Sequence, residues 1–124
     1  MSKIVRDDGF HADDFTGPAA VELASDTDPA QLESLIKGAE MVICDFPSFA
    51  DGRGFTLGRR LRDSGFTGRL RARGHVLADQ YAMARRSGFD EVEITDELAE
   101  RQPEDQWLAR ANWREHSYRR RLAG

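Results

Sequence analysis

The chain has 124 residues, of which 40% are hydrophobic and 32% charged, and its formal net charge is −4. A chain of this size suits one domain with a single modest core. No apolar run approaches the roughly 20 residues of a membrane helix, and the amino-terminal residues lack the apolar region of a secretory signal. We therefore expect one cytoplasmic domain spanning residues 1–124, without membrane association.

Charge is distributed unevenly along the chain. Nine arginines and only two acidic residues fall within residues 53–86, whereas residues 1–52 and 87–118 are acidic. The simplest interpretation is that the arginines pair with the flanking acids inside the fold. A sequence pI of about 5.4 and the acidic flanks also argue against nucleic-acid binding.

The amino-terminal third predicts short elements. Residues 1–18 indicate either a weak hairpin, with a turn at Asp8-Gly9 and a second stretch near Phe15, or a loosely held arm. Residues 20–23 predict a short strand. Asp28 and Pro29 are typical of a helix start, and Gly38 can end that helix.

The central region carries the clearest pattern. The apolar run at 41–46 predicts a strand buried on both faces, followed by a loop and a helix that ends at Ser64-Gly65-Phe66. A strand near 69–73 and a helix near 77–86 follow, and this helix ends at Ser87-Gly88-Phe89. A strand at 91–94 comes next. The repeated ending predicts successive β-α units with right-handed crossovers.

We therefore predict an α/β fold with a small parallel sheet, either open or half-barrel-like. Thr95 or Asp96 is expected to cap a short helix that Pro103 interrupts, and residues 104–124 are expected to form a carboxyl-terminal helix and tail. Arginines 69, 71 and 73 share one strand face, and Glu91 and Glu93 share a face of the next strand. We expect either the carboxyl-terminal helix with Trp107 and Trp113, or another subunit of a homo-oligomer, to cover these charges.

Ligands of open parallel sheets bind beyond the carboxyl ends of the strands. The loop at 46–55 lies at such an end, and its glycines precede a helix. One interpretation is a small-anion site with Arg53 as a bidentate contact. The other is a tight turn in which Asp51 caps the helix while Phe49 and Phe55 pack in the core. The predicted ligand-binding residues are Ser48, Asp51, Gly52, Arg53, Gly54 and Gln80.

Two further residues are candidates for catalysis at the same edge. His75 and Asp79 are spaced i, i+4, which suits an acid–base pair. The alternative is that His75 only hydrogen-bonds a nearby carboxylate. No cluster of histidine and cysteine predicts a metal site, no cofactor is identified, and Cys44 is expected to be a small buried hydrophobe.

Several stretches together are similar to a known family. They are residues 45–55, Leu61-Arg62, residues 68–80 and residues 86–90. In these stretches the chain resembles a bacterial family of unknown function whose members are linked to sulfate assimilation and sulfite reductase and are sometimes labelled probable oxidoreductases. The chain departs from the family pattern at Arg69, His75 and Ser87, where glutamate, aspartate and cysteine are usual.

This resemblance implies a place in sulfur assimilation without assigning catalytic residues. Our leading hypothesis is an accessory protein that binds a small anion or a partner enzyme, such as a sulfite reductase component, at the loop edge. The second is an oxidoreductase-type enzyme that uses His75 and Asp79 with the Arg53 loop. The third is a structural subunit of an oligomer.

Overall fold

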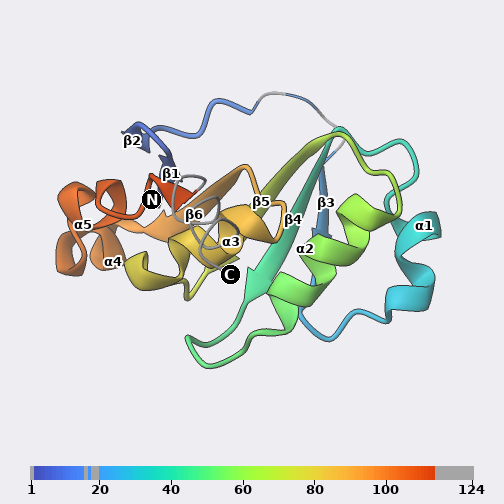
Figure 1. Ribbon diagram of the computed structural model, residues 1–124. Helices are drawn as coiled ribbons and strands as arrows, with labels where there is room; N and C mark the ends of the chain where they lie inside the picture. Colours follow the sequence, from blue (N-terminus) through green and yellow to red (C-terminus); the bar gives the residue numbers. More distant parts are fainter. Residues whose placement is uncertain (1, 16, 18–19, 114–124) are drawn as a thin grey trace, which may run out of the picture.

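The computed structural model describes residues 2–15, 17 and 20–113. Its six strands form one sheet in the order β2-β1-β6-β5-β4-β3 (Figure 1). Strands β3 to β6 run parallel in chain order, and β1 is antiparallel to both β6 and β2. The predicted open, mainly parallel α/β sheet is thus confirmed. The strands are β1 (Ser2–Arg6), β2 (Gly9–His11), β3 (Ala20–Leu23), β4 (Met41–Phe46), β5 (Arg69–Gly74) and β6 (Glu91–Thr95).

Short helices connect the strands. They are η1 (Pro29–Gln31), α1 (Leu32–Leu35), α2 (Arg53–Asp63), η2 (Ala78–Gln80), α3 (Tyr81–Arg86), α4 (Asp96–Arg101) and α5 (Glu104–Leu108). Asp28 accepts a hydrogen bond from the Ala30 backbone, as expected of a helix cap. Thr95, rather than Asp96, caps α4 by accepting from the Leu98 backbone.

Two predicted boundaries differ from the structure. The amino-terminal hairpin turns at Asp7-Asp8 and its second strand is Gly9–His11, so Phe15 lies beyond the hairpin. The carboxyl-terminal helix ends at Leu108 and a turn follows over residues 109–112, so it is shorter than predicted. Residues 114–124 of the predicted helix and tail lie outside the described residues.

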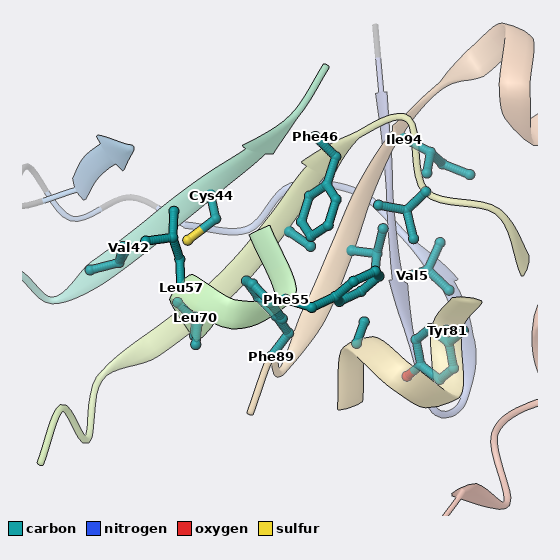
Figure 2. Packing of buried hydrophobic residues seen from close by; sticks show 14 of the residues in the cluster. Val5, Val42, Cys44, Phe46, Phe55, Leu57, Leu70, Tyr81, Phe89 and Ile94 are labelled. Atoms are coloured by element: carbon teal, nitrogen blue, oxygen red, sulfur yellow. The ribbon is translucent and has the colours of Figure 1, made fainter. Parts of the chain in front are cut away.

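One face of the sheet carries the hydrophobic core. Val42, Cys44 and Phe46 of β4 point to the same face because side chains alternate along a strand. Figure 2 shows these side chains meeting those of α2 and α3 in one layer. Helix α2 packs closely because it carries glycine where it crosses aromatic rings. A Cβ atom on Gly54 would lie 2.4 Å from the Phe46 ring, and one on Gly58 would lie 2.6 Å from the Phe89 ring.

The two Ser-Gly-Phe turns lie next to each other and share one arginine. Arg62 donates to the carbonyl oxygens of Gly88, Phe66 and Gly68 at 2.8 to 3.0 Å, and to the Asp90 carboxylate at 2.9 Å. These carbonyls follow the ends of α2 and α3, where backbone groups need partners. Arg62 therefore joins the two repeated turns that start β5 and β6.

The other face of the sheet is charged and centres on Glu91. This carboxylate is 2% exposed and accepts hydrogen bonds from Arg71 at 2.6 Å, Arg69 at 2.9 Å and Arg6 at 3.2 Å. The Arg71 side chain is 1% exposed and also donates to Glu93 at 2.9 Å. The predicted pairing between β5 and β6 is therefore present, and it is largely withdrawn from solvent.

The segment between β2 and β3 covers this charged face, a role that was not predicted from the sequence. Asp13 holds Arg71 with both carboxylate oxygens at 3.0 Å. Asp14 accepts from Arg6 and Arg69, and the Arg69 guanidinium lies 5.9 Å from the Phe15 ring centre. Trp107, which we expected here, instead packs against Tyr81 in the core.

The covering segment has little spare length. It joins β2 and β3, which are opposite edges of the sheet (Figure 1) and five strand spacings apart, about 24 Å. The nine peptide steps from His11 to Ala20 reach about 30 Å at full extension. The connection therefore has little slack, and its described residues Asp13 and Asp14 lie against the arginines.

We predict that Glu91→Gln lowers the free energy of unfolding by about 3 to 5 kcal/mol, because it leaves buried arginines without their shared anion. Asp14→Asn should cost far less, since the Asp14 side chain is 59% exposed. Urea unfolding measures both values. Equal, small losses for the two variants would contradict a central role for Glu91.

We also predict that the crossing tolerates insertion but not shortening. Deleting Gly17 and Pro18 leaves seven peptide steps, about 24 Å, so β2 or β3 must detach and unfolding should become easier by more than about 2 kcal/mol. Inserting Gly-Ser after Gly17 should cost less than about 0.6 kcal/mol. Thermal and urea unfolding compare the two, and similar stabilities would show that the crossing is slack.

Candidate functional site

The carboxyl ends of β3, β4 and β5 surround a cavity of about 570 Å³. The site therefore lies at the predicted edge of the sheet, where a parallel arrangement places its loops. Three loops supply its walls: one after β3, the long loop between β4 and α2, and the turn after β5. The lining residues are Ala24, Ser25, Asp26, Asp45, Phe46, Pro47, Arg53, Arg73, Gly74 and His75.

The loop before α2 is fastened by Asp51. Its carboxylate receives Nε and Nη2 of Arg53 at 3.0 and 2.8 Å, the Arg53 backbone N–H at 3.1 Å and the Ser25 hydroxyl at 2.9 Å. Hydrogen bonds from the Arg53 side chain and backbone hold the pKa of Asp51 well below its usual range. Asp51 therefore stays ionised, and it ties the β3 turn to the start of α2.

Arg73 forms the second charged group of the cavity. Its Nε donates to Asp45 at 2.8 Å and its Nη1 donates to Glu22, on two neighbouring strands. The side chain is 28% exposed. The hydrogen bond with Asp45 leads the effects that raise the Arg73 pKa. Arg73 thus continues the row of strand arginines up to the cavity wall.

Both arginines keep unused donors. A guanidinium has five N–H groups. No described residue accepts from Nη1 of Arg53 or from Nη2 of Arg73. Each side chain is therefore positioned by a carboxylate and still presents N–H groups to a further oxygen ligand.

His75 separates this cavity from a smaller one. The smaller cavity has a volume of about 170 Å³, and Gly74 and His75 line both. Gly74 has φ +113°, and a Cβ atom there would lie 2.8 Å from the Phe46 carbonyl oxygen, so only glycine fits this turn. The same oxygen lies 3.2 Å from Nδ1 of His75. Because a carbonyl only accepts, Nδ1 carries the proton in this contact, and Nε2 has no partner among the described residues.

Only some of the predicted site residues line the large cavity. Arg53 and His75 line the large cavity, with Asp51 behind Arg53. Gly54 serves the packing of α2 on Phe46. Gln80 braces two loops, because it donates to the Phe49 carbonyl at 3.1 Å and accepts from the Leu77 backbone at 2.8 Å. Ser48 and Gly52 are exposed in the loop and do not line the cavity.

Asp79 contacts Arg110 and not His75, its expected partner. Its carboxylate accepts from Arg110 at 2.7 Å, and no hydrogen bond joins it to His75 among the described residues. His75 instead has the Phe49 ring edge-to-face at 5.1 Å. The two predicted catalytic residues are therefore held by separate contacts.

Three polar residues of the cavity were not predicted from the sequence: Ser25, Asp26 and Arg73. Ser25 and Asp26 directly follow the short strand at 20–23, so treating that strand as a neighbour of β4 would have placed them here. Arg73 was assigned only to a strand face. Its position as the last side chain before Gly74 was the available signal.

The described part of the chain gives less support to a reactive cysteine or a metal site. Burial raises the pKa of the Cys44 thiol to about 12, so this cysteine stays protonated at neutral pH. Among residues 2–15, 17 and 20–113, no group of three histidine, cysteine or acidic side chains is placed to hold a metal ion. Within the same residues, the helices are all too short or too polar to cross a membrane.

Comparison with known proteins gave one match. Neither the curated proteins nor the solved structures contain a significant match to the chain. The profile of a bacterial protein family of unknown function, DUF934, matches residues 20–123, which include every lining residue of the large cavity. The match leaves out the hairpin and the whole segment that crosses the charged face. Because the match spans most of its length, the chain belongs to the DUF934 family of bacterial proteins of unknown function.

Proposed function

We propose that this protein is a binding protein of sulfur assimilation that takes a small oxyanion in the cavity between β3, β4 and β5. The observation that carries the proposal is the pair of arginines that line one cavity with unused N–H groups. Both are held in place by carboxylates, so little side-chain entropy is lost when an oxyanion binds. Arginine N–H groups are suited to the oxygens of sulfite, sulfate or a carboxylate.

A binding role has more support than an acid–base reaction. The hypothesis of an enzyme with His75 and Asp79 requires Asp79 to leave Arg110, which it contacts at 2.7 Å. The binding role is supported by two arginines that already line the cavity. The link to sulfur assimilation rests on the family resemblance in the β4–α2 loop and the β5 turn, which supply most of the site.

A partner enzyme is the second candidate ligand of this edge. Phe49 is 41% exposed at the tip of the β4–α2 loop. The Gln80 amide donates to its backbone carbonyl, and its ring lies edge-to-face with the His75 ring. Exposed aromatic side chains that are fixed in place are frequent anchors of protein interfaces. We propose that Phe49 docks on a sulfite reductase component, which would bring the cavity close to that enzyme.

The charged face of the sheet is a poor candidate for a homo-oligomer interface. Arg71 is 1% exposed, and Asp13 of the same chain already occupies its outer nitrogens. A second copy would have to displace the crossing segment before it reached these arginines.

We predict that sulfite and sulfate bind with a Kd on the order of 1 mM at low ionic strength, as expected for a few charge-assisted hydrogen bonds. Arg73→Gln and Arg53→Gln should each weaken binding about tenfold. Arg59→Gln is the matched control, because Arg59 is exposed on α2 and makes no ion pair within the described residues. Isothermal titration measures the affinities. Failure of both anions to bind, or equal losses in all three variants, would overturn the proposal.

We predict that Phe49→Ser weakens the complex with purified sulfite reductase components at least tenfold, because it removes an aromatic anchor. Met83→Ser is the control, since Met83 is 48% exposed but lies on α3, away from the loop. Biolayer interferometry compares the variants. Equal binding by both variants, or none by the native protein, would remove the partner role from this loop.

A further inference from the structure

The cavity that faces Arg53 and Arg73 also contains acids. Asp26 and Asp45 line it, so its four charged side chains cancel. Asp51 and Glu22 stand directly behind the two arginines and add two further negative charges. A bare anion would gain hydrogen bonds here but would meet no net positive field, because charges of both signs act on it at similar range.

Asp26 is the unusual member of this set. Asp45 and Asp51 are both held by arginine, whereas Asp26 forms no ion pair or hydrogen bond with any described residue. It is exposed at the rim of the large cavity and of a neighbouring one, and Arg53 is a lining residue of both. The charge of Asp26 acts on Arg53 from a distance, but no described group donates a hydrogen bond to its carboxylate.

The turn that carries Asp26 has a fixed shape. The Thr27 backbone and hydroxyl donate to the Ala24 carbonyl at 3.1 and 2.6 Å, which closes the turn around Ser25 and Asp26. The Ser25 hydroxyl anchors this turn to Asp51. Asp26 is thus held over the cavity by its neighbours while its own carboxylate stays unused.

We propose that the ligand is a zwitterion of amino-acid size, whose acid group binds Arg53 and Arg73 while its ammonium group pairs with Asp26. This inference rests on the proposed function, because it assumes that the arginines receive an oxyanion. It adds the chemical class of the ligand: an aminocarboxylate or aminosulfonate in place of a free inorganic anion. The cavity of about 570 Å³ has ample room for such a molecule.

A matched pair of probes tests this class. Taurine and ethanesulfonate share the sulfonate and the two-carbon chain and differ by one ammonium group. Isothermal titration at low ionic strength should show taurine binding the native protein about fivefold more tightly, since a partly exposed ion pair contributes up to about 1 kcal/mol. Sulfite serves as the reference anion.

Asp26→Asn should shift the two probes in opposite directions. Taurine should bind about fivefold more weakly, and ethanesulfonate two- to fivefold more tightly, because a repelling charge is removed. A change that only disturbed the turn would weaken both. Asp63→Asn is the control for net charge, since Asp63 lies at the far end of α2, outside the cavity, and it should change neither affinity by more than about twofold.

The outcomes separate the two proposals. If sulfite and ethanesulfonate bind but taurine gains nothing over ethanesulfonate, the zwitterion inference fails and the oxyanion site stands. If Asp26→Asn weakens both probes alike, the inference also fails. If neither sulfite nor either probe binds the native protein, the proposed function itself fails.

Discussion

The buried charge cluster around Glu91 constrains the rest of the molecule. Three arginines converge on one carboxylate that is 2% exposed, on a sheet face opposite the hydrophobic core. Charges withdrawn from water need partners in good geometry, because desolvation costs more than a loose pair returns. The sheet must therefore keep β5 and β6 in register and must hold the crossing segment over Arg71. The helices on the other face do not fix the strand register in this way, because apolar packing tolerates small shifts.

The covering segment resolves a difficulty of sequential parallel strands. Right-handed crossovers place α2 and α3 on one face, so the opposite face of a four-strand unit lies open unless something else covers it. Here the chain enters through a hairpin at one edge of the sheet and must reach the other edge to begin β3. The shortest route runs across the open face. The two aspartates on that route complement the arginines, so the topology of the chain and the charge pattern of the strands agree.

Much of this fold can be predicted because its signals are local. Glycines after α2 and α3, the alternation in β5 and β6, and the apolar run of β4 each report on a few neighbouring residues. The candidate site was predicted only in part, because its contacts join residues that are far apart in the sequence. The tie from Ser25 to Asp51 spans 26 positions, and the contact from Arg73 to Glu22 spans 51. Nothing in the sequence near Asp51 indicates that its carboxylate holds the Arg53 side chain in addition to the start of the helix. The position of Asp26 depends on β3 pairing with β4, a relation that exists only in the assembled sheet.

The charged face and the cavity are parts of one network. Arg69, Arg71 and Arg73 alternate along β5, and each binds acids from neighbouring strands or from the crossing segment. Arg73 is the last of the row and reaches the carboxyl edge, where it lines the cavity. The pairing that balances the charges of the strand arginines therefore also holds the Arg73 guanidinium in place at the candidate site. In such a site, affinity depends less on net attraction than on the arrangement of donors and acceptors. The proposed zwitterionic ligand would use both the donors and the acceptors of that arrangement.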